Sequence, residues 1–235
     1  MDSNRKRAVF LYDRTGIMAN PWVDAGYECW LFDGQHEPGI HRDGNLVKVG
    51  MWFYPGQIIE HAKMILSVVK SACFVFGFPE CTDLTVAGAK HFKKKFSENP
   101  AFQEEAIALC DLVRVVGNLL SCPYGFENPK WNVLSTKYRK PDFSFNPCDF
   151  GGYLPDGDIH PIYPEIYPSR DAYNKGTAIW IGNGFKIPRT KRIEPEFKEN
   201  PGWKKCGGKS LKTKNIRSAT PRGFAKAVFQ ANRIR

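Results

Sequence analysis

The sequence has little of what marks membrane and secreted proteins. No stretch approaches the roughly 20 consecutive apolar residues that a membrane-spanning helix requires. Residues 1–7, Met-Asp-Ser-Asn-Arg-Lys-Arg, lack the apolar segment of a secretory signal peptide. We therefore expect a cytoplasmic protein that has no membrane partner.

Metal sites and disulfide frameworks also lack their usual patterns. The seven cysteines are scattered, odd in number and without a Cys-x-x-Cys pair. The five histidines stand at no metal-ligand spacing from them. Zinc sites and disulfide-rich domains both depend on regular spacings. We therefore expect reduced thiols and no bound metal ion.

What the sequence has in excess is positive charge. Its 34 lysines and arginines against 24 acidic residues give a formal net charge of +10. This balance favours a polyanionic partner, most simply nucleic acid. A length of 235 residues is enough for one sizeable core. We expect a single domain over residues 1–235 and a monomer.

Apolar runs alternate with helical patterns through most of the chain. Ile58, Ala62, Ile65 and Val69 recur at helical spacing, for example, whereas residues 8–12 form a short apolar run. We expect strands at 8–12, 27–32, 46–49, 73–78, 122–126 and 178–181, and helices at 21–26, 56–70, 102–120 and 221–232. Strands that alternate with helices predict an α/β fold with a doubly wound, mostly parallel sheet.

Two segments after residue 130 interrupt this alternation. Residues 137–170 are dense in Pro, Tyr, Phe, Gly and Asp, and their prolines break regular structure repeatedly. Residues 186–215 carry many lysines and arginines. We expect both to be small irregular insertions, the first either ordered or partly mobile and the second solvated.

A cysteine and a glutamate each follow a short apolar run. Residues 73–78 lead into Pro79 and place Cys81 on the next loop, and a later run leads directly to Glu127 and Asn128. In an open α/β sheet, the loops at the carboxyl ends of the strands form the ligand crevice. A thiol and a carboxyl group there can act as a nucleophile and a proton donor on one substrate.

The loop after the first strand is placed to hold a nucleotide-like cofactor. In doubly wound sheets this loop approaches the ligand, and an acid at the end of the second strand bonds ribose hydroxyls. Asp33, followed by Gly34, stands at the expected end of the second strand. A plain strand-to-helix turn is the alternative for residues 13–16, Asp-Arg-Thr-Gly. The acid-ended second strand favours the cofactor site.

These motifs resemble those of the DNA cytosine-5 methyltransferases, particularly the small phage-type members. The segments that carry the resemblance include Pro79-Glu80-Cys81, Glu127-Asn128, Tyr138-Arg139-Lys140-Pro141, Phe145-Asn146-Pro147, Phe150-Gly151, Lys175-Gly176-Thr177 and residues 216–225. The resemblance implies a Rossmann-like S-adenosylmethionine-dependent methyltransferase fold, S-adenosylmethionine as cofactor and double-stranded DNA as partner. It implies methyl transfer to carbon 5 of a flipped-out cytosine, in a bacterial or phage-infected host cell.

The resemblance also implies roles for individual residues. Cys81 adds to carbon 6 of cytosine, Glu127 acts at N3, and Asn128 orients the glutamate or the base edge. Lys175 and Thr177 stand where larger relatives have two arginines that hold the cytosine carbonyl and the catalytic loop. The residues expected at the cofactor are Tyr12, Asp13, Thr15, Gly16, Ile17, Met18, Asp33, Gly34, Pro79 and Ser218.

The sequence departs from the family at several of these places. Gly16 is the only glycine kept in a loop that is usually glycine-rich, and Glu80 stands where a second proline is usual. Residues 47–50 lack the acid that the family commonly offers to adenine. The nearest cations in sequence that can help the Cys81 thiol to ionise are the histidine and lysines of residues 91–95.

Three alternatives stay open beside methyl transfer. The first is a relative that binds DNA and cofactor without transferring a methyl group. The second delivers another group to a pyrimidine through the same thiol adduct. The third is a basic nucleic-acid-binding module that binds no S-adenosylmethionine. For the methyltransferase, the insertions 137–170 and 186–215 are the candidates to contact DNA phosphates.

Overall fold

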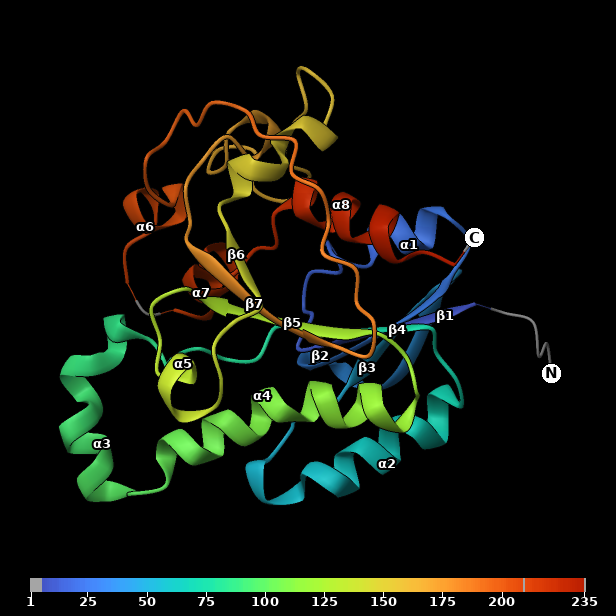
Figure 1. Cartoon of the computed structure of the whole chain (residues 1–235), viewed down its shortest axis with the longest axis vertical. Helices are drawn as coiled ribbons and strands as arrows, with labels where there is room; N and C mark the ends of the chain where they lie inside the picture. The colour runs from blue at the N-terminus through green and yellow to red at the C-terminus, as the bar shows by residue number, and fades with distance from the viewer. Residues whose placement is uncertain (1–5, 209, 235) are drawn as a thin grey trace.

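A seven-stranded sheet in the order β3-β2-β1-β4-β5-β7-β6 lies at the centre of the computed structural model, which describes residues 6–208 and 210–234 (Figure 1). Strands β1, β2, β4 and β5 pair in parallel, whereas β7 runs antiparallel to both neighbours. The predicted α/β class with a mostly parallel sheet is confirmed. The strands are β1 (Arg7–Leu11), β2 (Glu28–Asp43), β3 (Leu46–Gly50), β4 (Phe74–Gly77), β5 (Tyr124–Pro129), β6 (Phe143–Phe145) and β7 (Thr177–Gly182).

Helices cover both faces of the sheet (Figure 1). One face carries α2 (Ile58–Val69) and α4 (Phe102–Leu119), and the other carries α1 (Asn20–Asp24) and α8 (Arg222–Asn232). No helix in the described part of the chain is both long and apolar enough to cross a membrane. The shorter helices are α3 (Phe92–Glu98), α5 (Leu134–Lys137), α6 (Pro201–Lys205) and α7 (Leu211–Arg217), with 3-10 turns η1 (Pro55–Gln57), η2 (Val86–His91), η3 (Pro147–Tyr153) and η4 (Ser169–Asp171).

The alternation of side chains along β1 explains the two layers. Successive residues of a strand point to opposite faces of the sheet. Val9 and Leu11 are buried in the cluster beneath α2 and α4, whereas Ala8 and Phe10 are buried in the cluster with α1 and α8. Because β7 is antiparallel and its first residue pairs with the last residue of β5, it begins at the edge where the parallel strands end.

Strand β2 differs from its prediction. The sequence predicts an end at Asp33-Gly34, which is wrong, because the strand continues and turns back. Its first part pairs with β3 in parallel, but the part from Pro38 pairs with β3 in the opposite direction, as in a hairpin. The turn brings the chain so close that a Cβ on Gly50 would lie 2.2 Å from the Glu37 carbonyl oxygen. The turn-rich composition predicts a loop here, and pairing with β3 overrides it.

Residues 137–170 contribute to the sheet and the core. They supply β6, an edge strand that is not among the predicted strands because it is only three residues long. Phe145 and Phe150 stack near Phe224 of α8, with ring centroids 4.2 and 5.3 Å from it. A buried ion pair between Asp171 and Arg222, with nitrogen and oxygen 2.9 Å apart, ties the end of this region to the same helix.

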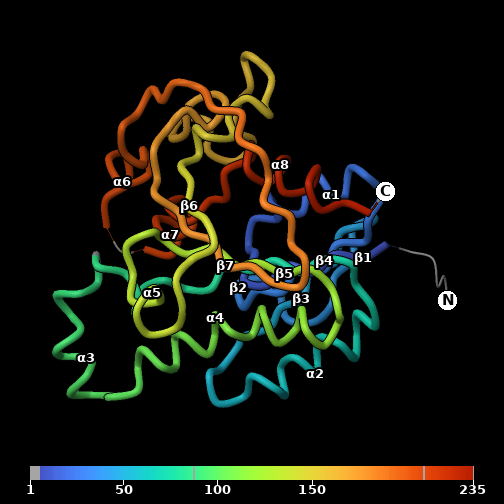
Figure 2. The backbone as a smooth tube through the Cα atoms, in the orientation of Figure 1, coloured from blue at the N-terminus to red at the C-terminus, as the bar shows by residue number. Residues whose placement is uncertain are grey.

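The basic segment 186–215 begins as irregular chain and ends in helices. Figure 2 shows it rising from β7 over the top of the view and descending to α6. Its first part pairs with η3, where the Lys191 amide donates to the Asp149 carbonyl at 2.9 Å. Most described side chains of this segment are exposed, as expected for a solvated insertion, whereas Asn200 and Thr213 are buried where α6 and α7 pack on the domain.

Candidate functional site

The cysteine loop follows β4 at the carboxyl edge of the sheet. Strand β4 ends at Gly77, and Cys81 lies on the next loop, half-buried. The Cys81 carbonyl oxygen accepts hydrogen bonds from the amides of Leu84 and Thr85, both at 3.0 Å. These bonds form one tight turn that fixes the position of the cysteine backbone.

The end of β5 is joined to this loop by a buried amide. Asn128 is 1% exposed, and its Nδ2 donates to the Pro79 carbonyl oxygen at 3.2 Å. Its Oδ1 accepts from Asn132 at 3.3 Å. Glu127 precedes it in the strand and so points to the other face of the sheet. Asn128 therefore holds the cysteine loop beside the strand that carries Glu127.

The start of β7 adds a cation to the same edge. Lys175 lies two residues before the strand, and its carbonyl oxygen accepts a hydrogen bond from the Thr177 hydroxyl at 3.0 Å. Thr177 is 1% exposed, so this hydroxyl is satisfied locally. The neighbouring Gly176 carbonyl accepts from the Lys130 amide at 2.9 Å, which ties the segment to the loop after β5.

Three of these groups act on one another electrostatically. Burial and then the Glu127 carboxylate raise the pKa of the Cys81 thiol to about 11, although the Lys175 ammonium opposes both. Burial raises the pKa of Glu127 as well, and Lys175 again opposes the shift. The thiol is therefore protonated near neutral pH in the free protein. Removing the negative charge of Glu127 lowers the pKa of Cys81.

Glu80, which departs from the family pattern, is exposed and paired with a lysine of α7. Its side chain is exposed, accepts a hydrogen bond from the Thr82 hydroxyl at 2.7 Å, and lies 3.3 Å from the Lys214 ammonium of α7. The pKa of Cys81 is raised less by Glu80 than by Glu127. The cation that acts on the thiol is Lys175 rather than residues 91–95.

The loop after β1 carries a buried carboxylate with a free oxygen. Asp13 is 2% exposed, and its Oδ1 accepts from the amides of Gly16 at 2.7 Å and Thr15 at 3.2 Å. Its Oδ2 has no hydrogen-bond partner among the described residues. Burial and then the charge of Asp33 raise the pKa of Asp13 to about 6, although the Gly16 amide opposes this. A hydrogen-bond donor from a ligand is the natural partner for that oxygen.

Asp33 provides a second acid beside the first. Its Oδ1 accepts from the Gln35 amide at 2.7 Å, and burial raises its pKa. The Nε2 atom of His36 lies 3.1 Å from the Asp13 carbonyl oxygen, which completes this polar edge. Two acids, one with an unpaired buried oxygen, fit a ligand that carries an ammonium group and ribose hydroxyls. S-adenosylmethionine carries both.

Helix α7 covers a cavity of about 480 Å³ next to these acids. Asn215 of α7 exchanges two amide hydrogen bonds with Gln35, at 2.9 and 3.3 Å. Gly34 leaves room for the indole of Trp52, because a Cβ there would lie 2.1 Å from a ring atom. The cavity is lined by Arg14, Gln35, Trp52, Tyr163, Leu211, Lys212 and Asn215. Sequence patterns did not reveal Gln35 and Asn215, since their pairing exists only once α7 is docked.

The other residues expected at the cofactor differ in their surroundings. The Tyr12 backbone has a φ of 59°, and its hydroxyl donates to the Leu109 carbonyl oxygen of α4 at 2.8 Å. The side chains of Ile17 and Met18 are buried in the core, so these residues can contact a ligand only through their backbone groups. Ser218 is exposed at the end of α7, where its hydroxyl donates to the Asn215 carbonyl at 3.3 Å.

Among the described residues, no group of three or more His, Cys, Asp or Glu side chains is arranged to hold a metal ion. Comparison of the sequence with protein-family models gives no match, and comparison with the curated proteins gives none either. The structure brings Cys81, Glu127, Asn128 and Lys175 together at one edge and places Asp13 and Asp33 together farther along it.

Proposed function

We propose that this protein is a DNA cytosine-5 methyltransferase with a Rossmann-like S-adenosylmethionine-dependent methyltransferase fold, similar to the small phage-type enzymes. One observation carries the proposal. Cys81, Glu127 and Lys175 come from three separate parts of the chain, and their charges act on one another at the carboxyl edge of the sheet. A nucleophile, a proton donor and a cation are what attack on a pyrimidine ring requires.

The chemistry follows from the charges of these groups. The Cys81 thiol loses its proton to solvent water, and the sulfur forms a bond to carbon 6 of cytosine while Glu127 gives its own proton to N3, which leaves an electron-rich carbon 5. Burial keeps Glu127 protonated to a higher pH than an ordinary carboxyl group, so it can hold that proton. After substitution at carbon 5, transfer of the proton there to solvent water expels the sulfur as a thiolate, and the N3 proton returns to Glu127. Lys175 stabilises both anions.

The acids at β1 and β2 are the proposed cofactor site. S-adenosylmethionine supplies an electrophilic methyl group when bound. The unpaired Oδ2 of Asp13 would accept from its ammonium group, and Asp33 from its ribose hydroxyls. Thr15 and Gly16 shape the loop, since both amides bond to Asp13. The order of β1, β2 and β4 supports this placement, because the strand order reverses between β1 and β4.

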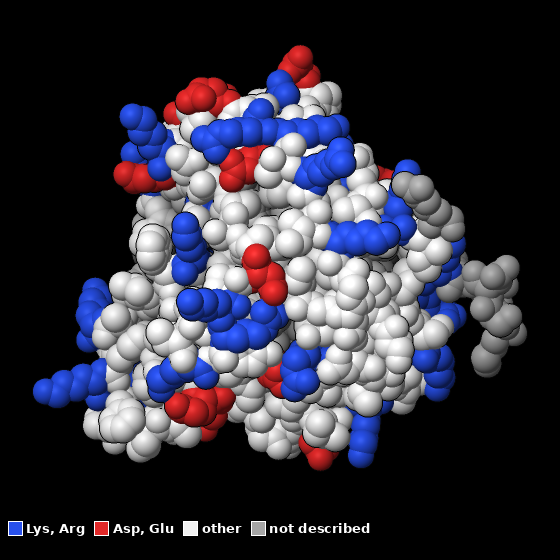
Figure 3. All heavy atoms as spheres, viewed as in Figure 1, with Lys and Arg blue, Asp and Glu red and all other residues white. Residues whose placement is uncertain are grey.

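Double-stranded DNA is the proposed substrate. The net charge is +10, and Figure 3 shows lysine and arginine side chains grouped near β7 and α5 on the face in view. A cytosine must leave the duplex to reach Cys81, which costs a few kcal/mol of stacking and pairing. Segments 137–170 and 186–215 lie beside this edge and are the proposed contacts to the DNA backbone.

A second candidate is a relative that binds DNA and S-adenosylmethionine without methyl transfer. The observation that favours it is the pKa of Cys81, which burial raises to about 11. A thiol that stays protonated in the complex would add to cytosine too slowly. The two candidates differ in whether binding of the base lowers that pKa.

The test uses purified full-length protein, unmethylated duplex DNA and S-adenosylmethionine that carries an isotope label in its methyl group. Digested nucleosides are then analysed by mass, with wild type and Cys81→Ala side by side. Labelled 5-methyldeoxycytidine from the wild type alone is the expected result. Label on adenine or on the exocyclic nitrogen of cytosine would overturn the thiol mechanism. Intact binding without label would favour the second candidate.

A further inference from the structure

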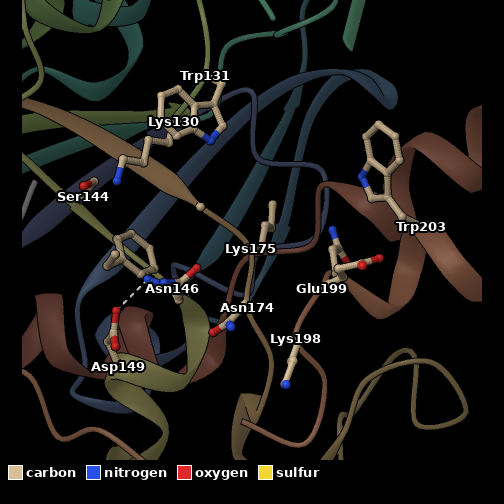
Figure 4. A pocket seen from close by; sticks show the side chains of 13 residues that line it. Lys130, Trp131, Ser144, Asn146, Asp149, Asn174, Lys175, Lys198, Glu199 and Trp203 are labelled. Carbon is tan, nitrogen blue, oxygen red and sulfur yellow. Dashed lines mark hydrogen bonds between the residues drawn. The ribbon is translucent and has the colours of Figure 1, made fainter. Parts of the chain in front are cut away.

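A second cavity, of about 610 Å³, opens beside the proposed catalytic residues (Figure 4). Its walls come from the loop after β5, the region of β6 and η3, the segment before β7, and α6 with the residues before it. Cys81 and Glu127 are not among the described residues that line it. The cavity is therefore separate from the thiol and carboxyl groups of the proposed reaction, although Lys175 belongs to its lining.

Two exposed tryptophans border this cavity from opposite sides (Figure 4). Trp131 is 72% exposed and Trp203 is 58% exposed. Each ring lies near a cation, with the Lys130 ammonium 5.5 Å from the Trp131 centroid and the Arg217 guanidinium 5.1 Å from that of Trp203. Large aromatic rings left in water beside a cavity are typical of a binding surface.

The cavity lining also carries positive charge, although the Lys175 ammonium acts on Glu127 as well. Lys130, Lys175 and Lys198 line it, and none of the three forms a salt bridge with a described carboxylate. The two acids of its lining, Asp149 and Glu199, are each already paired with a basic residue. The cavity is therefore suited to an anion, and its indoles are suited to a flat ring.

We propose that this cavity holds an unpaired nucleotide of the DNA strand, adjacent to the target cytosine. Its base stacks on an indole of Trp131 or Trp203, and its phosphates contact the three lysines. Stacking on aromatic rings within a basic groove is how proteins bind single strands with little sequence preference. Lys175 connects the two sites, because it lines the cavity and its charge also acts on Cys81. This inference rests on the proposed function, which makes DNA the substrate.

The test measures binding of labelled single-stranded oligonucleotides to the full-length protein by fluorescence anisotropy at several salt concentrations. Trp131→Ala or Trp203→Ala should weaken binding about 5- to 150-fold, which is the loss of one stacked base. Trp131→Phe and Trp203→Phe should retain most of the affinity, because a phenyl ring still stacks. Lys198→Gln should reduce the slope of log affinity against log salt by about 0.7.

Matched controls lie on surfaces away from the cavity. Tyr54→Ala removes an aromatic side chain that is 56% exposed before η1, and Lys63→Gln removes an exposed charge on α2. Both should bind the oligonucleotide like wild type. The inference is overturned if wild type binds no single strand, or if the alanine variants at Trp131 and Trp203 bind as tightly as wild type.

The same variants separate this inference from the proposed function. Methyl transfer is measured in parallel on duplex DNA. Loss of oligonucleotide binding in the tryptophan variants supports the cavity even if wild-type protein transfers no methyl group. Methyl transfer by wild type, combined with unchanged binding and transfer in Trp131→Ala and Trp203→Ala, overturns the cavity and leaves the proposed function standing.

Discussion

The two halves of the carboxyl edge differ in how complete they are without a ligand. At β1 and β2, the acids Asp13 and Asp33 are buried and held by amides of their own loops. At β4, β5 and β7, the thiol of Cys81 is half-buried, and burial and Glu127 keep its pKa high. In the first half, both carboxyl groups already accept hydrogen bonds, and only the Oδ2 atom of Asp13 lacks a donor among the described residues. The second needs a change in charge before its nucleophile can react.

The difference suggests that the two halves respond to different partners. The unpaired oxygen of Asp13 is satisfied by any donor that enters the crevice. The thiol of Cys81 ionises more readily while Glu127 is protonated, because the neutral carboxyl group does not raise the pKa of the thiol. In our proposal Glu127 carries that proton until N3 of the base accepts it. The high pKa of Cys81 keeps the thiol protonated, and therefore little reactive, in the free protein.

The largest effect should come from Glu127→Gln. The amide can neither give nor recover a proton, so methyl transfer should fall about 10²- to 10⁴-fold. Removing the carboxylate should lower the pKa of Cys81, so alkylation of that thiol at a fixed pH should become faster. Peptide mass analysis after timed alkylation follows Cys81 among the seven cysteines. Unchanged transfer in this variant would show that Glu127 is not the proton donor.

Glu80→Gln is the matched control for that prediction. Glu80 is exposed and paired with Lys214, and it raises the pKa of Cys81 less than Glu127 does. We expect a smaller gain in the rate of alkylation and nearly unchanged methyl transfer.

The second largest effect should come from Lys175→Met. Loss of the ammonium removes the group that lowers the pKa of both Cys81 and Glu127. The pH of half-maximal alkylation of Cys81 should therefore rise, by about one unit or more. Lys130→Met, in the same DNA-free assay, should leave that pH in place. Equal shifts in the two variants would indicate a general loss of positive charge instead of a specific contact.

Asp13→Asn tests the other half of the edge through pH. The folded pKa of Asp13 is raised from 3.8 to about 6, so the folded state holds this proton more tightly than the unfolded state. Ionisation therefore costs stability: the cost is absent below 3.8, grows as pH rises, and is complete above about 6. As the pH rises from 4 to 7, wild type should lose stability relative to Asp13→Asn. The difference in unfolding free energy between the two proteins should change by up to about 3 kcal/mol in favour of the variant.

Chemical denaturation at both pH values measures that shift, and a constant difference between the two proteins would contradict it. Cofactor affinity should move the opposite way. The neutral amide bonds an ammonium group more weakly than a carboxylate does, so calorimetry should show binding of S-adenosylmethionine about tenfold weaker or more. Asp33→Asn is the comparison, since the Asp33 oxygen already accepts from the Gln35 amide.

The smallest effect should come from Asn215→Ala. This change removes the amide pair that holds α7 against Gln35 over the cavity near Trp52. Because a net hydrogen bond contributes about 1 kcal/mol, dissociation of S-adenosylmethionine should become about fivefold faster. Gln35→Ala should give the same change, and the double variant no more than either one. Additive effects in stopped-flow release would mean that the pair does not act as a unit.

Some elements were predictable because their signals are local. The helical spacing from Ile58 to Val69 became α2, and the cap at Thr220-Pro221 is followed by α8. The apolar run at β1 became a buried strand. The reversal of β2 and the short strand β6 were missed, since each depends on a neighbouring strand rather than on its own composition.

The candidate site shows the same division. Cys81 and Glu127 were found from the runs before them and from a family resemblance, both of which are visible along the chain. Lys175 was found through the resemblance alone, and its charge acts on the thiol because β7 runs antiparallel. Asn215 carries no signal of its own, since its partner Gln35 is distant in sequence.

By itself, the sequence determined the α/β class, the order of most elements and the residues that follow the apolar strands, because periodicity and turn chemistry act over a few neighbouring residues. Only the tertiary structure decided which side chains meet. It paired Glu80 with Lys214, placed Lys175 where its charge acts on Cys81, and left one buried oxygen of Asp13 without a donor among the described residues. Burial and charge pairing depend on distances across the fold, and these exist only when the sheet is assembled.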